Sequence, residues 1–230
     1  MAQTLALLHT TPTLCALFNA LAATHLPGVR LVHLVDESLL KNTIAAGRLE
    51  KATTRRLINL VGSAFDAGAD AVMVTCSSIG PAADIATTLF DAPVFRVDAA
   101  MAERAVANAR RVGIVATLAT TLGPTVALVR QKAAEAGRDV EVIECLCTGA
   151  FEAVIAGDTA GHDRAVGQAI REKMQGVDAI VLAQASIARV LQSLPPAEIP
   201  APVFASPELG LQRAREILAG LKRASVGSNP

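Results

Sequence analysis

The sequence predicts an α/β protein made of two pseudo-symmetric lobes, each a parallel four-stranded sheet flanked by helices, with a ligand cleft between them. Three observations predict this fold. The chain repeats itself once, its expected strands are apolar along their whole length, and stretches of helical period separate those strands. Strands of that kind are typical of parallel sheets that helices cover on both faces. With 230 residues, of which 52% are hydrophobic, the chain is long enough to bury such a core.

The repeat is clearest around one apolar run in each half of the chain. Gly68–Ile79 matches Gly176–Ile187 without a gap, at an offset of 108 residues. Ala92–Phe95 matches Ala201–Phe204 at an offset of 109 residues. Both halves also open on an apolar strand that leads into a turn rich in threonine and proline. Matches in the same order at nearly constant spacing indicate two copies of one unit.

Each copy alternates apolar, β-branched runs with longer stretches rich in alanine, leucine and arginine, which predicts strands alternating with helices. In the first copy we expect strands at 4–9 (TLALLH), 29–35 (VRLVHLV), 71–75 (AVMVT) and 93–97 (PVFRV), and helices at 12–24, 48–67, 80–90 and 98–109. In the second copy we expect strands at 111–116 (RVGIVA), 140–146 (VEVIECL), 178–183 (DAIVLA) and 202–205 (PVFA), and helices at 121–136, 159–175, 186–193 and 207–222. The first lobe is then expected to comprise 1–97 and 206–230, and the second 98–205.

Charge and aromatic content argue against a nucleic-acid partner. Lys plus Arg and Asp plus Glu number 21 each, Trp and Tyr are absent, and Phe occurs 6 times. A nucleic-acid surface needs clustered positive charge and usually aromatic rings on which bases stack. We therefore expect no nucleic-acid partner.

Two uncharged stretches, 1–29 and 112–129, are candidates for membrane signals, and both are interrupted. His9–Pro12 breaks the apolar part of the first stretch, which also lacks a basic start. Threonines, glycines and a proline break the second. Because a spanning helix needs about 20 consecutive apolar residues, we expect no membrane association and a cytoplasmic location.

The four cysteines, Cys15, Cys76, Cys145 and Cys147, are expected to be reduced thiols. Cys145 and Cys147 are too close in sequence for an ordinary disulfide, and no pattern pairs the other two. The Cys-x-Cys pair supplies only two of the four ligands of a usual zinc site, so we expect no metal. Nucleotide binding has no support either, because the glycine-rich phosphate motifs are missing.

Cys76 directly follows a predicted strand and precedes Ser77 and Ser78. Ligands of parallel α/β sheets bind at the carboxyl ends of the strands, so this is a place where function is expected. A thiol before a helix N-terminus meets backbone N–H groups and the positive end of the helix dipole, which are expected to lower its pKa from about 8.5 towards neutrality. The alternative is a buried core cysteine followed by two helix-capping serines.

His9 ends the first predicted strand, and Thr10 begins the turn after it. His9 is expected to bind a carboxylate or to set the charge of Cys76. The alternative is a capping histidine beside threonines that start the next helix. Thr117 and Thr121 belong to the matching turn of the second copy, and of these Thr117 is preferred for ligand contact.

Four motifs in this order and spacing resemble the aspartate/glutamate racemase superfamily, whose members include Asp/Glu and hydantoin racemases, maleate isomerase and arylmalonate decarboxylase. They are Val72–Ser78 (VMVTCSS), Arg111–Thr117 (RVGIVAT), Ala179–Ser186 (AIVLAQAS) and Ala201–Glu208 (APVFASPE), and the resemblance covers essentially the whole chain. It implies two pseudo-symmetric lobes, a site in a cleft and no cofactor. It also implies that racemases of this kind use one cysteine from each half, one removing and one returning the α-proton.

The sequence departs from that pattern at one position. The ungapped match places Gln184, not a cysteine, where the second catalytic thiol is expected. An amide can donate and accept hydrogen bonds, but it cannot take up a proton near neutral pH. The resemblance therefore implies a racemase- or isomerase-type enzyme that acts next to the carboxylate of a small carboxylic or amino acid with Cys76 alone. Two alternatives stay open: a one-thiol decarboxylase or lyase similar to arylmalonate decarboxylase, and a small-acid-binding protein without catalysis.

Charge that gathers on the substrate carboxylate needs hydrogen-bond donors already in place. The residues expected to bind the substrate are His9, Thr10, Ser77, Ser78, Thr117, Thr121, Gln184 and Ser186. The expected partner is a small carboxylic acid. The alanine-rich helices are also compatible with a homo-oligomer, a dimer or a higher assembly.

Overall fold

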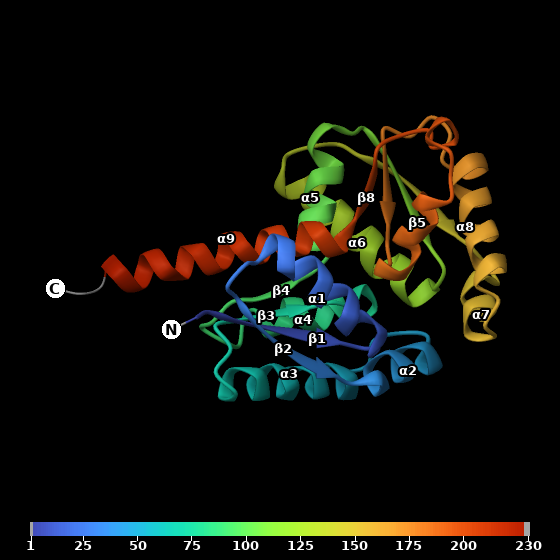
Figure 1. The fold of residues 1–230 in the computed structure, drawn as a ribbon. Helices are drawn as coiled ribbons and strands as arrows, with labels where there is room; N and C mark the ends of the chain where they lie inside the picture. The colour runs from blue at the N-terminus through green and yellow to red at the C-terminus, as the bar shows by residue number, and fades with distance from the viewer. Residues whose placement is uncertain (1, 228–230) are drawn as a thin grey trace. The chain divides into compact units, whose positions relative to one another are not determined.

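The computed structural model describes residues 2–227, except for the side chains of residue 192 and of residues 224–227. The chain divides into two compact units. The first consists of Met1–Val97 and Pro207–Pro230, and the second of Asp98–Ser206. Both units contain one four-stranded parallel sheet with helices on its two faces (Figure 1). The chain is therefore an α/β protein, as the alternation of apolar runs and helical stretches predicts.

The first unit has the strand order β2-β1-β3-β4, in which every neighbouring pair is parallel. Its elements along the chain are β1 (Thr4–His9), α1 (Thr13–His25), β2 (Arg30–Val35), α2 (Glu37–Ala46), α3 (Lys51–Asp66), β3 (Ala71–Val74), the short 3₁₀ helix η1 (Ser77–Ile79), α4 (Gly80–Ala86), β4 (Val94–Arg96) and, from the end of the chain, α9 (Ser206–Gly227).

The second unit has the corresponding strand order, β6-β5-β7-β8, and is again parallel throughout. Its elements are α5 (Ala99–Asn108), β5 (Arg111–Ala116), α6 (Ala119–Glu135), β6 (Glu141–Leu146), α7 (Ala150–Ile155), α8 (Thr159–Lys173), β7 (Ala179–Leu182), the 3₁₀ helices η2 (Ala185–Gln192) and η3 (Pro196–Glu198), and β8 (Val203–Ala205).

Equivalent backbone hydrogen bonds show that the two units are copies of one another. The Thr75 N–H donates to the Leu8 carbonyl at 3.0 Å in the first unit, and the Ala183 N–H donates to the Val115 carbonyl at 3.0 Å in the second. Since Leu8 and Val115 lie two residues before Thr10 and Thr117, these bonds make Thr10 the counterpart of Thr117. By the same register, Cys76 is the counterpart of Gln184.

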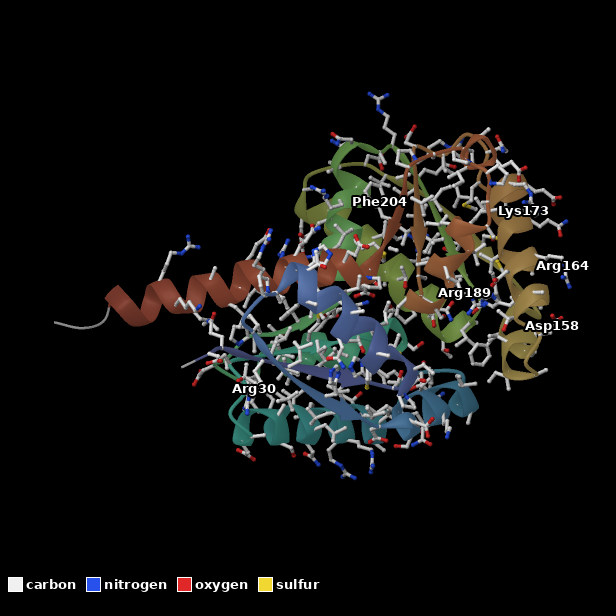
Figure 2. All side chains as sticks on the ribbon, viewed as in Figure 1. Arg30, Asp158, Arg164, Lys173, Arg189 and Phe204 are labelled. Atoms are coloured by element: carbon white, nitrogen blue, oxygen red, sulfur yellow. The ribbon has the colours of Figure 1, made fainter. Side chains whose placement is uncertain are left out.

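The sheet of the first unit is buried on both faces because its side chains alternate. Leu5 and Leu7 pack with α1 and α9 on one face, and Ala6 and Leu8 pack with α2, α3 and α4 on the other. Figure 1 shows α3 along one side of this sheet and α9 along the other. The second unit buries β5 and β7 against α7, α8 and η2 on one face (Figure 2).

One glycine of the second unit lies in close packing. A Cβ atom at Gly113 in β5 would lie 2.2 Å from the Met174 Sδ atom, so a larger residue here would require the Met174 side chain to move. Helices of membrane-spanning length and hydropathy do not occur among residues 2–227.

The expected strands are all present, each within one residue of its predicted ends, whereas the helices agree less closely. No helix was predicted at α2 or α7, the helix predicted at 80–90 ends at Ala86, and the helix predicted at 186–193 is the 3₁₀ helix η2. The signals for α2 were local: the Asp36 side chain caps it by accepting a hydrogen bond from the Ser38 N–H at 3.0 Å, and Gly47 ends it with a φ of 66°. α7 has only 6 residues, too few for a helical period to be recognised.

Candidate active site

Cys76 is the second residue after β3 and directly precedes η1. Its side chain is half-buried and packs against the apolar cluster shared by β1, β3 and α4. The thiol is hydrogen-bonded to the side chains of Thr10 and Ser78 and to the backbone N–H groups of Ser78 and Ile79. Four donors thus surround one sulfur atom, as expected for a strand end that meets a helix start.

The protonation state of Cys76 differs from the sequence-based expectation. Burial raises the pKa of the Cys76 thiol, and it outweighs the hydrogen bonds from Thr10, Ser78 and Ile79, which act in the opposite direction. The expected lowering of the pKa is therefore wrong for this unit. Since the thiol keeps its proton near neutral pH, Cys76 is a proton donor at rest and not a free thiolate.

A labelling experiment follows from these pKa directions. The hydrogen bond from the Cys147 thiol lowers the pKa of Cys145 to about 7, whereas that of Cys76 lies above its ordinary value. Because only the thiolate reacts with iodoacetamide, we expect Cys145 to be labelled faster than Cys76 at neutral pH. Labelling of Cys76 should accelerate only at a pH above the ordinary pKa of a cysteine. Mass spectrometry of peptides over a pH series measures both labelling rates, with the urea-unfolded chain as the reference. Preferential labelling of Cys76 at neutral pH would contradict the raised pKa of its thiol.

Ser77 and Ser78 are both buried within η1, with 6% and 1% of their surfaces exposed. Ser78 is the serine that contacts the thiol. The backbone carbonyl of Ser77 accepts the N–H of Gly80, which links η1 to α4. Of the two predicted serines, only Ser78 is therefore seen to touch Cys76.

His9, the last residue of β1, makes its contacts away from Cys76. Its Nδ1 atom is 2.8 Å from Thr75 Oγ1, and its Nε2 atom is 2.9 Å from His33 Nδ1. Burial, together with the neighbouring His33, lowers the pKa of His9 to about 4. A neutral imidazole adds no positive charge for a carboxylate or for Cys76, and the role of His9 in substrate binding stays a prediction.

The second unit repeats the Thr10–Cys76 pair with an amide in place of the thiol. Gln184 is the second residue after β7 and directly precedes η2, just as Cys76 directly precedes η1. Its Oε1 atom accepts hydrogen bonds from the Thr117 N–H at 2.7 Å and from Thr117 Oγ1 at 3.0 Å. The amide oxygen is thereby held, and the two N–H donors of the Gln184 amide are turned away from Thr117. Thr117 and Gln184, both selected from the sequence, are therefore in direct contact.

The other two candidates of the second unit differ in exposure. Thr121 lies in the first turns of α6 and is 2% exposed, and its carbonyl accepts the Thr125 hydroxyl at 2.9 Å. Ser186 is exposed on η2, two residues after Gln184. Solvent therefore reaches Ser186, whereas Thr121 is a buried residue of α6.

An ion-pair cluster that sequence reasoning missed fixes η2 to α8. Arg189 Nη2 is 2.7 Å from Asp163 Oδ1 and 3.2 Å from His162 Nδ1. Figure 2 shows Arg189 on η2 beside α8. The hydrogen bond from Arg189 lowers the pKa of Asp163. This contact holds the segment that begins with Gln184, and its residues are 26 positions apart, which no local motif would indicate.

The arrangement common to both units is a threonine at the end of the first strand bonded to a polar side chain at the end of the third. The family model of the Asp/Glu/hydantoin racemases matches residues 8–214, which include every residue of both pairs. The chain belongs to this family. Its members are enzymes, and the two units with their parallel sheets correspond to the two-lobed fold expected of them. Curated proteins give no significant match to this family member.

Solved structures of two racemases and of a racemase homologue share the fold. Glutamate racemase from Francisella tularensis, crystallised with D-glutamate, is 16% identical with a TM-score of 0.73, covering 96% of this chain and 82% of its own. Allantoin racemase from Klebsiella pneumoniae is 18% identical with a TM-score of 0.65, covering 94% of this chain and 88% of its own. An aspartate racemase homologue from Pyrococcus horikoshii is 15% identical with a TM-score of 0.66, covering 95% and 100%. At these identities the likeness concerns the fold alone.

Proposed function

We propose that this racemase-family enzyme moves a proton at the carbon next to the carboxylate of a small carboxylic or amino acid, with Cys76 as its single proton-transferring thiol. One observation carries the proposal. At the equivalent strand ends of the two units stand a thiol and an amide, each bonded to an equivalent threonine, and of the two only the thiol can exchange a proton. A racemase- or isomerase-type reaction is the outcome that family membership supports.

The chemistry of such a step is limited to a proton and an electron pair. When a thiolate at Cys76 removes the α-proton, the electrons of the carbon–hydrogen bond move into the carboxylate, which becomes an enediolate. When the proton returns to the carbon, the enediolate collapses to the carboxylate. The donors around the sulfur, Thr10 and Ser78 with the N–H of Ile79, stabilise the thiolate that exists before the proton is removed and after it has returned to carbon. The free N–H groups of Gln184 are suited to a carboxylate oxygen.

Decarboxylation is the second candidate, and the raised pKa of Cys76 favours it. Loss of carbon dioxide from a substituted malonate leaves its electron pair on the α-carbon as an enediolate, so no base is needed. One acid is then sufficient to complete the reaction, and a thiol that holds its proton near neutral pH is such an acid. The amide at Gln184 is no obstacle to this reaction.

Proton NMR in deuterated water separates the candidates. We expect the protein, incubated with small α-amino acids and 2-substituted malonates, to exchange the α-proton of at least one acid for deuterium. An isomerase leaves the number of carboxyl groups unchanged, whereas a decarboxylase removes one and adds one deuterium to the product. Saturation-transfer spectra of the same samples show which acids bind. Binding without exchange or decarboxylation would contradict the proposal and identify a small-acid-binding protein.

A further inference from the structure

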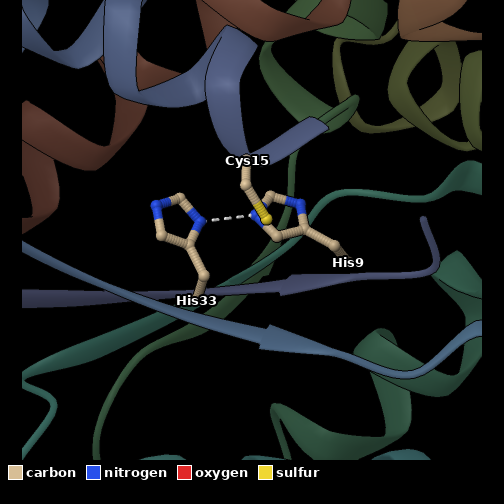
Figure 3. A group of neighbouring side chains, drawn as sticks. All are labelled: His9, Cys15 and His33. Atoms are coloured by element: carbon tan, nitrogen blue, oxygen red, sulfur yellow. Dashed lines mark hydrogen bonds between the residues drawn. The ribbon is translucent and has the colours of Figure 1, made fainter. Parts of the chain in front are cut away.

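Three metal-ligating side chains of the first unit converge on one point. One ligand atom from each of His9, Cys15 and His33 lies within 4.8 Å of the other two, and Figure 3 shows the Cys15 sulfur beside the facing nitrogens of the two rings. His9 ends β1, Cys15 is in the first turn of α1, and His33 lies within β2. His9 is buried, and the other two are half-buried. Solvent therefore reaches the cluster from one side.

This cluster is separate from the thiol at Cys76 because it occupies the other face of the sheet. Leu7, two residues before His9, belongs to the face that packs on α1 and α9. The His9 ring also contacts Phe18 of α1, with the ring centroids 5.5 Å apart. Cys76, in contrast, packs with the residues of the opposite face. The proposed proton transfer uses none of the three ligating side chains.

Hydrogen bonds on the far side of each ring decide where its lone pair points. Thr75 Oγ1 donates to the Leu8 carbonyl at 3.0 Å, so it accepts from His9 Nδ1, and the lone pair of His9 is on Nε2. His33 Nε2 lies 3.0 Å from the Asn19 Oδ1 atom, an amide oxygen that can only accept, so its lone pair is on Nδ1. The two lone pairs face each other across 2.9 Å.

Two facing lone pairs repel unless a positive charge lies between them. A metal ion bound to both nitrogens supplies such a charge, and the Cys15 sulfur lies within reach of the same point. Ligating histidines almost always donate their second ring N–H to a fixed acceptor, which is what Thr75 and Asn19 provide here.

We propose that His9, Cys15 and His33 bind one Zn²⁺ ion through His9 Nε2, Cys15 Sγ and His33 Nδ1, with a fourth position left open. Two imidazoles and a thiolate with no carboxylate select zinc over magnesium or calcium. Zinc–nitrogen bonds of about 2.0–2.1 Å at a tetrahedral angle place the two nitrogens roughly 3.3 Å apart, so the rings need to separate by only a few tenths of an ångström. The sequence-based expectation of no metal arose because these ligands come from three elements and form no spacing motif.

Titration with Co²⁺, followed by displacement with Zn²⁺, tests the site without reference to activity. In the full-length protein we expect one Co²⁺ per chain, a near-ultraviolet band of cobalt–thiolate charge transfer and the visible bands of tetrahedral cobalt. Cys15→Ser should abolish the charge-transfer band, and Asn19→Ala should weaken binding about 10–100-fold. Cys145→Ser is the matched control, because it removes a half-buried thiol from the second unit, and it should leave the spectrum unchanged.

Two results would overturn the proposal. The first is the absence of Co²⁺ binding, which would mean that the Asn19 amide is reversed and that the histidines form an ordinary hydrogen bond. The second is a cobalt–thiolate band that survives Cys15→Ser or disappears in Cys145→Ser. Far-UV circular dichroism checks the folding of each variant, and His33→Gln replaces Cys15→Ser as the decisive variant if the latter does not fold. Because deuterium exchange measures the chemistry of Cys76 independently, failure of one proposal is distinguishable from failure of the other.

Discussion

Replacing Cys76 with serine should lower the rate of deuterium exchange or decarboxylation by roughly 10²–10⁴-fold, the usual contribution of one general acid or base. A serine hydroxyl has nearly the size of the thiol and retains hydrogen bonds to Thr10 and Ser78, but it is far too weak an acid to give or take a proton at carbon. The loss should therefore fall on kcat and leave KM nearly unchanged. Initial rates from NMR at several substrate concentrations separate the two parameters.

Cys145→Ser is the control for this prediction, since it makes the same change of atom at a half-buried cysteine of the second unit. Its kcat should equal that of the unmodified protein. Equal losses in the two variants would show that the thiols act through stability and not through proton transfer. Full activity in Cys76→Ser would remove Cys76 from the mechanism altogether.

Gln184→Cys should produce or increase interconversion of enantiomers, on the order of 10²-fold above the unmodified protein. The substitution places a thiol at both equivalent strand ends, which is the pair of cysteines that the family resemblance implies for two-thiol racemases. Thr117 remains as a hydrogen-bond partner for the new side chain. The measurement starts from each pure enantiomer of the acid that responds in deuterated water and follows optical rotation or chiral chromatography.

The control for the second thiol is Gln184→Ser. This variant shortens the side chain and disturbs the bond to Thr117 in a similar way, but it adds no group that titrates in the required range. Its rate of enantiomer interconversion should stay at the level of the unmodified protein. If Gln184→Cys and Gln184→Ser behave alike, a second thiol at this strand end does not complete a racemase.

The strands were predictable because each is an apolar run and because the repeat supplies every one of them twice. The match of Gly68–Ile79 with Gly176–Ile187 alone aligns β3 with β7 and Cys76 with Gln184. α2 and α7 were missed because they are short and closely follow β2 and β6. In so few residues the helical spacing of apolar side chains is difficult to recognise. The path of η2 depends on the bond of Arg189 to Asp163, a contact between distant segments.

The sequence indicates which strand-end residues lie together in each unit, but it does not indicate their electrostatics. Strand ends and the repeat point to Cys76, Thr117 and Gln184, and the last two are bonded. The pKa of Cys76 was predicted in the wrong direction, because a sequence shows the donors near a strand end but not the depth of burial that opposes them. The pairing of His9 with His33 needs the register of β1 with β2, in which Leu7 lies opposite His33.

The order of the segments along the chain has a consequence for synthesis. The sheet of the first unit is complete by Val97, yet its α1 face is covered in part by Leu211, Ala214 and Leu218 of α9. A ribosome must translate the whole second unit before these three side chains exist. Until then Leu5, Leu7 and Met73 lack part of their apolar cover, so the nascent first unit is a natural client for chaperones. The second unit is one uninterrupted segment, so all of its residues are translated one after another.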